Sequence, residues 1–318
     1  MTDVAVVGAG LMGHALALVH ALGGHQVRLT DSNPKTLARA PELMATALQT
    51  LVEGGEADKS WTRQRLAQAV QCISSLRETV SGAALVVEAI VEEVEAKRTL
   101  YAQLAELMAP TAILASNTSH LDVFPLAPAG LQPRILIAHW YTPPYLVDLV
   151  DVVGGPQCDP KHVEFLRAMY SAMGKQPVVF QKFVPGYVAN RIQAAISQEV
   201  YRLLDEGVVT PREVDLSVIH GLALRIPILG HLAKADFTGL PLVQRSMANR
   251  KDEPAPPPLR NSKLLDKILA DGGTGVMSGK GFFDWGGRTP EELFQDRDRR
   301  LMGLKQALRK LGGALEGE

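Results

Sequence analysis

The sequence predicts a two-domain protein in which a doubly wound α/β domain precedes an all-helical domain. Three observations predict it. Short β-branched runs alternate with helical patterns from Val4 to about Phe180, the strand-like runs stop there, and a long apolar stripe follows. The 318 residues fit about two domains. With 46% hydrophobic and 21% charged residues, the chain has the composition of a folded globular protein.

The strands expected in the first domain are short, and several carry apolar residues on both faces. They cover Val4–Val7, Gln26–Thr30, Leu85–Glu88, Ile113–Ser116, Ile135–Ala138, Leu149–Val153 and Pro177–Phe180. Such strands are typical of a mostly parallel sheet that helices cover on both faces. A helical stretch begins after Ser32-Asn33-Pro34 and continues to about Ala69, with an interruption at Gly54-Gly55. We expect this stretch to form a projecting helical arm.

The second domain begins after a break at Pro185-Gly186. One apolar stripe then recurs every four residues, as expected of a long helix with one buried face, through Val188, Ile192, Ile196, Val200 and Leu204. Thr210-Pro211-Arg212-Glu213 predicts a capping box, and the tail from Pro290 to Leu311 is charged and helical in pattern. The prolines between 254 and 258 predict an irregular loop. We therefore expect domains at residues 1–184 and 185–318, with apolar stripes of the helical domain forming a homodimer interface.

Charge and cysteine content exclude several classes of protein. The formal net charge is −1, which removes the global electrostatic basis for binding nucleic acid. Cys72 and Cys158 lie far apart without a CxxC pair, so neither a disulfide scaffold nor a metal site is expected. No apolar run is long enough to cross a bilayer, and the first strand begins too early for a leader peptide. We expect a soluble cytoplasmic protein without a metal, a nucleic-acid partner or a membrane partner.

A glycine-rich turn follows the first predicted strand. Gly8, Gly10 and Gly13 form a GxGxxG pattern with Leu11 and Met12 inside it, directly between a strand and a helix. In a Rossmann-type domain these glycines make the tight turn, admit a pyrophosphate and allow close packing of the helix on the strand. The helix N-terminus then favours the phosphate charge.

An acidic residue ends the second predicted strand. Asp31 lies where a carboxylate accepts the ribose hydroxyls of a dinucleotide, and its charge repels a 2′-phosphate. The following Ser32 and Asn33 supply no arginine for such a phosphate. This position favours NAD over NADP, and the chain is short for a typical flavoprotein reductase, which disfavours FAD.

One of the eight histidines stands out as a candidate base for an NAD-dependent alcohol dehydrogenase. His139 ends the predicted strand Ile135–Ala138, and ligands bind at the carboxyl ends of parallel strands. Asp151 occupies the next strand, where a carboxylate would orient the imidazole and stabilise its protonated form. A buried structural histidine is the alternative interpretation of His139.

Several motifs together resemble one family, the L-3-hydroxyacyl-CoA dehydrogenases with their lambda-crystallin/L-gulonate 3-dehydrogenase and L-carnitine dehydrogenase relatives. They are VGAGLMG from Val7, VVEAIVEEVEAK from Val86, SNTS from Ser116, HWYTPPYLVDLVDVV from His139, VPGYVANR from Val184 and GKGFFDW from Gly279. The motifs occur in the same order and span nearly the whole chain, which is far more specific than GxGxxG alone.

The resemblance implies a role for individual positions. His139 matches the catalytic base, and Asp151 stands where the family normally has the glutamate paired with it. Ser119 and Asn190 match residues that hold the substrate oxygen near the histidine. The resemblance also assigns three residues to the nicotinamide end of the coenzyme site: Glu92, Lys97 and Asn117. Without it, each of those three would be interpreted as a surface or loop residue.

The resemblance leaves the substrate open between a CoA thioester and a short free hydroxy acid. Aspartate at position 151 is one methylene shorter than glutamate, so either the acid–histidine pair survives in a tighter geometry or another acid assists and the rate is modest. Pro143-Pro144-Tyr145 is similar to the gulonate and carnitine enzymes, and between residues 36 and 58 Arg39 is the one cation available for CoA phosphates. The GKGFF motif at Gly279 is similar to the acyl-CoA enzymes, and Lys59, Arg63 and Arg65 could still reach a phosphate.

Two other classes of protein compete with this interpretation. Enzymes of the 6-phosphogluconate/3-hydroxyisobutyrate type share the two-domain plan but use a lysine early in the interdomain helix, where this chain has Arg191 and no lysine. A non-catalytic NAD-binding relative, such as a structural crystallin, stays open because Asp151 replaces the glutamate. The favoured hypothesis is reversible oxidation of a C3 hydroxyl by NAD, with His139 as the base.

Overall fold

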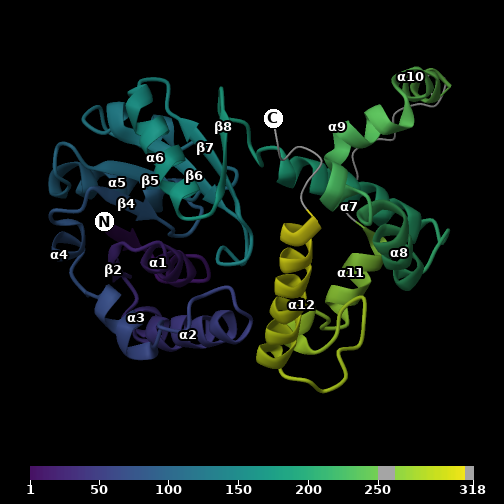
Figure 1. The fold of residues 1–318 in the computed structure, drawn as a ribbon, viewed down its shortest axis with the longest axis horizontal. Helices are drawn as coiled ribbons and strands as arrows, with labels where there is room; N and C mark the ends of the chain where they lie inside the picture. Colours follow the sequence, from purple (N-terminus) through teal and green to yellow (C-terminus); the bar gives the residue numbers. More distant parts are fainter. Residues whose placement is uncertain (250–261, 312–318) are drawn as a thin grey trace. The chain divides into compact units, whose positions relative to one another are not determined.

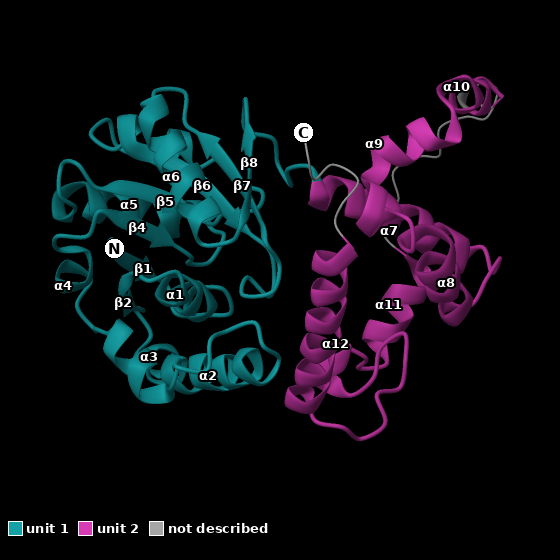
Figure 2. Ribbon diagram, viewed as in Figure 1, with its two compact units in different colours: residues 1–188 teal, residues 189–318 magenta. Residues whose placement is uncertain are grey.

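The computed structural model describes residues 1–249 and 262–311 and divides into two compact units. Unit 1 comprises Met1–Val188 and unit 2 comprises Ala189–Glu318 (Figure 2). The division falls a few residues after the expected boundary at 184 and 185. The loop predicted around the prolines between 254 and 258 lies outside the described residues.

Unit 1 is built around one eight-stranded sheet with the order β3-β2-β1-β4-β5-β6-β7-β8 (Figure 1). The strands are β1 Asp3–Val7, β2 Gln26–Thr30, β3 Val70–Cys72, β4 Leu85–Glu88, β5 Ile113–Ser116, β6 Ile135–Trp140, β7 Leu149–Gly154 and β8 Gln176–Phe180. Strands β6 and β7 are antiparallel, and every other neighbouring pair is parallel. The predicted mostly parallel Rossmann-type sheet is confirmed.

The helices of unit 1 connect these strands. They are α1 Gly13–Leu22, α2 Pro34–Glu53, α3 Arg63–Ala69, α4 Leu76–Val80, α5 Val94–Leu107 and α6 Pro160–Ala172, with 3-10 turns at Phe124–Leu126 and Gln132–Arg134. Helix α2 begins at Pro34 because the Asn33 side chain accepts a hydrogen bond from the Lys35 amide at 2.9 Å. Met44, Leu48 and Leu51 of α2 are buried, and α2 contacts α1, α3 and β3. The predicted arm therefore packs on the domain through one face.

Unit 2 is helical, as predicted. Its helices are α7 Ala189–Asp205, α8 Pro211–Ser217, α9 Ile226–Thr238, α10 Leu240–Ala248, α11 Lys263–Ala270 and α12 Pro290–Leu311, with a π-helical turn at Val218–Ala223 and a 3-10 turn at Val276–Ser278. Thr210 and Glu213 form the predicted capping box at the start of α8.

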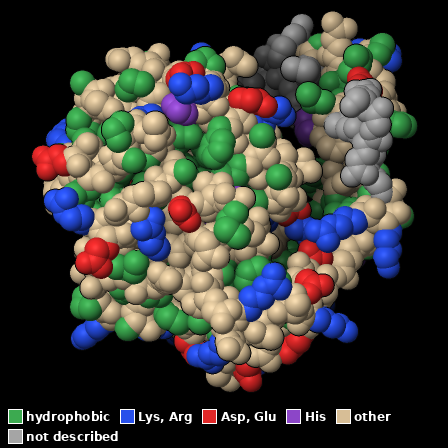
Figure 3. All heavy atoms as spheres, turned by 60° about the vertical axis from the view of Figure 1, so that its left-hand side comes forward, with side chains coloured by type: hydrophobic (Ala, Val, Ile, Leu, Met, Phe, Trp, Pro, Cys, Tyr) green, Lys and Arg blue, Asp and Glu red, His purple; other side chains and the backbone are tan. Residues whose placement is uncertain are grey.

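The surface carries both signs of charge. On the face drawn in Figure 3, lysine and arginine side chains are interspersed with aspartate and glutamate. Within residues 1–249 and 262–311, no single helix combines the length and hydropathy needed to cross a membrane. The bent pair Pro211–Ala223 and Ile226–Thr238 meets that test only when its two parts are taken together.

Candidate active site

The three glycines after β1 have different structural duties. Gly8 has a φ of +98°, and a Cβ added there would lie 2.5 Å from the Ala89 carbonyl oxygen. A Cβ on Gly13 would lie 1.7 Å from the Gly8 carbonyl oxygen, so the start of α1 packs directly on the turn. A Cβ on Gly10 would have nothing within 4 Å. Gly8 and Gly13 are thus required by packing, whereas Gly10 leaves open space above the turn, where the pyrophosphate of a dinucleotide is admitted.

The carboxylate of Asp31 lies beside this turn. Its Oδ2 accepts a hydrogen bond from the Ala9 amide at 2.7 Å, and its Oδ1 accepts one from the Asn33 amide at 2.7 Å. These two bonds fix the carboxylate at the ends of β1 and β2 and leave further lone pairs for ribose hydroxyls. Leu11 is 75% exposed, and Met12 Sδ accepts a hydrogen bond from the Thr142 hydroxyl at 3.2 Å. The turn and the carboxylate fit the adenosine and pyrophosphate parts of NAD.

His139 and Asp151 face each other across two strands. Strand β6 continues to Trp140, so His139 lies inside the strand, and its predicted position just after the strand end is wrong. His139 pairs directly with Asp151 in the antiparallel β6–β7 ladder. Directly opposite residues have Cβ atoms about 5 Å apart on one face of the sheet, so the two side chains project from the sheet side by side. His139 Nδ1 lies 3.3 Å from Asp151 Oδ2, and both side chains are buried.

The other ring nitrogen of His139 meets the loop after β5. Ser119 Oγ lies 3.1 Å from His139 Nε2. In the tautomer in which Nδ1–H donates a hydrogen bond to the Asp151 carboxylate, Nε2 keeps a lone pair. A hydroxyl that approached Ser119 Oγ and Nε2 together would find a hydrogen-bond partner and a proton acceptor. The structure thus brings three of the four predicted catalytic residues together.

Glu92 holds the loop that carries Ser119. Its Oε1 accepts hydrogen bonds from the backbone amides of Ser119, His120 and Leu121 and from the Thr118 hydroxyl, at 2.5–3.0 Å. Partial burial raises the pKa of this carboxyl group, but the amide and hydroxyl donors together outweigh it and lower the pKa. Glu92 therefore stays an anion that fixes the position of the Ser119 loop.

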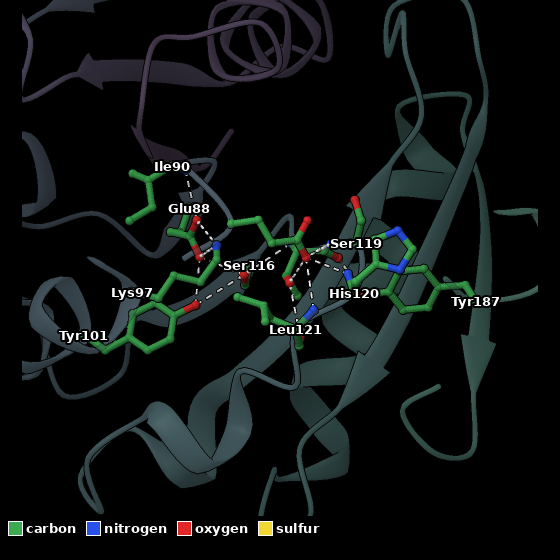
Figure 4. Close-up of polar contacts among 11 residues, drawn as sticks. Glu88, Ile90, Lys97, Tyr101, Ser116, Ser119, His120, Leu121 and Tyr187 are labelled. Atoms are coloured by element: carbon green, nitrogen blue, oxygen red, sulfur yellow. Dashed lines mark hydrogen bonds and ion pairs between the residues drawn. The ribbon is translucent and has the colours of Figure 1, made fainter. Parts of the chain in front are cut away.

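Lys97 lies in a buried cluster around Glu88. The Lys97 ammonium is 2.6 and 2.8 Å from the two Glu88 oxygens, and the hydroxyls of Tyr101 and Ser116 each donate to Glu88 at 2.7 Å. Figure 4 shows these three side chains converging on Glu88. Lys97 is 1% exposed, so it lies buried beside the last residues of β4 and β5 and has almost no contact with solvent. Burial and the Glu88 charge raise the pKa of Tyr101 well above its ordinary value, so it remains a neutral donor.

The remaining two predicted residues have separate locations. Asn117 Oδ1 accepts a hydrogen bond from the Trp140 amide at 2.9 Å, which ties the β5 loop to the end of β6. Asn190 is the second residue of α7 and belongs to unit 2, so the geometry of unit 1 does not include it.

Tyr187 was not among the predicted site residues. Its ring stacks on the His139 imidazole with a centroid distance of 4.6 Å, and its hydroxyl donates to the Thr118 carbonyl at 2.6 Å. Its φ of 51° lies in the left-handed region, which is unfavourable for a bulky residue and is found where surrounding contacts fix it. Burial and the Asp151 charge raise the pKa of Tyr187, so the hydroxyl stays protonated. The VPGYVANR motif contained this residue, but its contact with His139 depends on tertiary structure.

Two family models match the chain in sequence order. Residues 3–183 match the NAD binding domain of 3-hydroxyacyl-CoA dehydrogenase, and residues 186–285 match the C-terminal domain of the same enzyme. The chain belongs to the 3-hydroxyacyl-CoA dehydrogenase family. The predicted resemblance is confirmed, including its lambda-crystallin and L-carnitine dehydrogenase branch. Members of this family are NAD-dependent dehydrogenases of CH–OH groups, so unit 1 is an NAD-binding domain, as the glycine turn predicted.

Similar family members cover the chain almost from end to end. The 5-formyl-3-hydroxy-2-methylpyridine 4-carboxylate 5-dehydrogenase of Mesorhizobium japonicum is 30% identical over 314 residues, which cover 96% of this chain and 98% of that protein. The L-carnitine dehydrogenase of Streptomyces griseus is 30% identical over 320 residues, with coverages of 98% and 92%. A crystal structure of a 5-formyl-3-hydroxy-2-methylpyridine 4-carboxylic acid 5-dehydrogenase, described as an NAD+-dependent dismutase, superposes with a TM-score of 0.85 at 27% identity, covering 97% of this chain and 99% of that one.

Proposed function

We propose that this protein reversibly oxidises the C3 hydroxyl of a small free L-3-hydroxy acid, with NAD as the hydride acceptor. The observation that carries the proposal is a chain of contacts through His139. Ser119 Oγ lies 3.1 Å from His139 Nε2, and His139 Nδ1 lies 3.3 Å from Asp151 Oδ2. An alcohol oxidation needs a base for the hydroxyl proton, and these contacts supply His139 as the base and Asp151 as the group that orients it.

In this mechanism His139 Nε2 accepts the hydroxyl proton of the substrate. Ser119 binds the substrate oxygen, and we assign Asn190 of α7 the same task from the resemblance of its VPGYVANR motif. Asp151 stabilises the imidazolium that forms, and its effect is strong because the two side chains are only 4% and 2% exposed. Bound NAD supplies the hydride acceptor, and the residues assigned to hold it are Gly8, Gly10, Gly13 and Asp31. In the reverse direction, His139 returns the proton to a carbonyl oxygen.

The charges of the α2–α3 region support a free acid over a CoA thioester. Arg63 is paired with Glu42, and Arg65 donates to Ser60 Oγ at 2.5 Å with its guanidinium 4.3 Å above the Trp61 ring. Two of the cations that could reach a CoA phosphate therefore already have partners within this region. Two relatives whose matches cover 96% and 98% of this chain are named for a pyridine carboxylate and for L-carnitine, and neither name is that of a CoA thioester, which points the same way.

A CoA thioester is the second candidate. The match of residues 186–285 to the C-terminal domain of 3-hydroxyacyl-CoA dehydrogenase favours it, and so does the GKGFF motif within that range.

The experiment is a screen for NADH formation with the purified full-length chain and NAD+. The substrates are free L-3-hydroxybutyrate, L-gulonate and L-carnitine, each compared with L-3-hydroxybutyryl-CoA. We expect a higher kcat/KM for one of the free acids. A higher kcat/KM for the thioester would support the second candidate, and no turnover of any would contradict the proposed function.

The matched control is His139→Ala. Loss of a general base lowers kcat roughly 10²–10⁴-fold, so turnover should fall by about a thousandfold. NADH affinity, followed by its fluorescence, should stay nearly the same because the ring does not form the phosphate turn. Retained turnover would overturn the assignment of the base.

A further inference from the structure

The acid of the proposed dyad has a second partner on the same oxygen. Asp151 Oδ2 accepts a hydrogen bond from the Tyr141 hydroxyl at 2.6 Å, while His139 Nδ1 lies 3.3 Å from that oxygen. A hydrogen bond between a charged donor and a carboxylate is normally about 2.7–2.9 Å long. The tyrosine contact is therefore the shorter of the two, and it defines where Oδ2 lies.

Tyr141 touches the base as well as the acid. Its ring meets the His139 imidazole edge to face, with a centroid distance of 4.6 Å and an interplanar angle of 77°. Tyr187 stacks on the same imidazole. The imidazole is thus held by two aromatic rings, and one of these rings also carries the hydroxyl that fixes the carboxylate.

The length of the acid explains why such support is needed. Asp151 has one methylene and one rotatable bond fewer than glutamate, so its carboxylate has less reach toward His139. It is also 1% exposed, and a buried carboxylate is costly unless donors satisfy its lone pairs. The Tyr141 hydroxyl meets both requirements, since it satisfies a lone pair and restricts rotation of the carboxylate.

We propose that Tyr141 is a positioning residue that compensates for the short side chain of Asp151 by holding Oδ2 against His139 Nδ1. The inference rests on the proposed function, because it concerns the same base. Tyr141 acts through the carboxylate and exchanges no proton with the substrate.

The test is a double-mutant cycle in the full-length chain with the best substrate of the screen. The four proteins are the wild type, Tyr141→Phe, Asp151→Glu and the double variant. Tyr141→Phe should lower kcat roughly tenfold, because that factor corresponds to the free energy of one hydrogen bond to a charged group. The KM for NAD+ should stay unchanged. In the Asp151→Glu background the same change should cost less than about twofold, because the longer acid reaches His139 without support.

Tyr170→Phe is the matched control, because it also removes a buried tyrosine hydroxyl. Its ring packs on Trp140 with a centroid distance of 4.9 Å. We expect its kcat to equal that of the wild type. An equal loss from Tyr141→Phe in both backgrounds, or no loss in either, would overturn the proposal.

A second readout needs no turnover. The His139 Nδ1–H proton gives a low-field NMR resonance when it is hydrogen-bonded to the carboxylate, and His139→Gln identifies it by its loss. In Tyr141→Phe this resonance should move upfield, since the contact loosens. An unchanged resonance, or a downfield move that marks Tyr141 as a competitor, would contradict the inference. If the wild type oxidises no hydroxy acid, the proposed function fails, while this resonance still decides whether Tyr141 holds the acid in place.

Discussion

The two units use their apolar residues differently. In unit 1, strands β1, β4 and β6 are almost wholly buried, and the core continues through α1. In the described part of unit 2, Leu293 and Met302 are the buried hydrophobic residues, and α7 has no buried residue at all. Meanwhile Leu232 and Phe237 are 79% and 78% exposed. Unit 1 therefore completes its own core, whereas most large apolar side chains in the described part of unit 2 are not buried.

The largest effect on stability should come from adding a methyl group to the tightly packed glycine turn of unit 1. Gly13→Ala places a methyl group 1.7 Å from the Gly8 carbonyl oxygen, so the backbone of the turn must move. We expect a loss of about 3 kcal/mol in the free energy of unfolding, at the upper end of overpacking effects, and loss of NADH binding. Denaturant unfolding and NADH fluorescence measure the two.

Gly10→Ala is the control for this change, since a Cβ there has nothing within 4 Å. Its unfolding free energy should stay within about 0.5 kcal/mol of the wild type, while NADH affinity falls. Equal stability losses at Gly10 and Gly13 would show that packing at the turn does not differ as described.

An intermediate effect should follow from a charge on the apolar stripe of unit 2. Ile192 is 53% exposed on α7, and we predict that a second copy of the chain covers this stripe. Burial of an isoleucine contributes about 2 kcal/mol, so Ile192→Glu should weaken the dimer roughly 10–100-fold. Sedimentation over a range of concentrations measures it, and Gln198→Glu on the opposite side of α7 should leave the mass unchanged. A monomeric wild type would contradict the predicted interface.

The smallest effect should come from a helix cap. Thr210→Ala removes the hydroxyl that accepts a hydrogen bond from the Glu213 amide in the α8 capping box, while the backbone amide of residue 210 can still donate to the Glu213 carboxylate. We expect a loss of about 1 kcal/mol in unfolding free energy, and Thr210→Ser should restore it. Because the cap belongs to unit 2, NADH binding should not change. An altered NADH affinity would show that the two units do not behave separately.

The elements of unit 1 could be predicted because local pattern and burial agree there. Gln26–Thr30 and Leu85–Glu88 were predicted with the bounds that the structure has. Strand β3 was missed, since Val70–Cys72 is three residues long with an exposed centre and no alternation to detect. The strand around His139 was predicted too short because Trp140 extends it through pairing with Val150, which is a tertiary contact.

The site was predictable where a strand end or a motif marked it. The predicted strands suggested His139 and Asp151, a motif added Ser119, and the structure brings these three together. The contacts of Tyr141 and Tyr187 could not be inferred, because they depend on which rings surround the imidazole after folding. Lys97 was assigned to the coenzyme from the resemblance, while its burial against Glu88 is visible only in three dimensions.

The ladder pairing of His139 with Asp151 has a consequence for how such a dyad arises. Main-chain register fixes the two Cβ atoms opposite each other whatever the length of the acid, whereas a pair mounted on flexible loops has no such constraint. A slip of one residue would instead send the two side chains to opposite sides of the sheet. A histidine and an aspartate at directly opposite positions of two antiparallel strands, on a face shielded from solvent, would have the same backbone arrangement in another protein. The pair is therefore suited to the design of a base with its orienting acid in an unrelated scaffold.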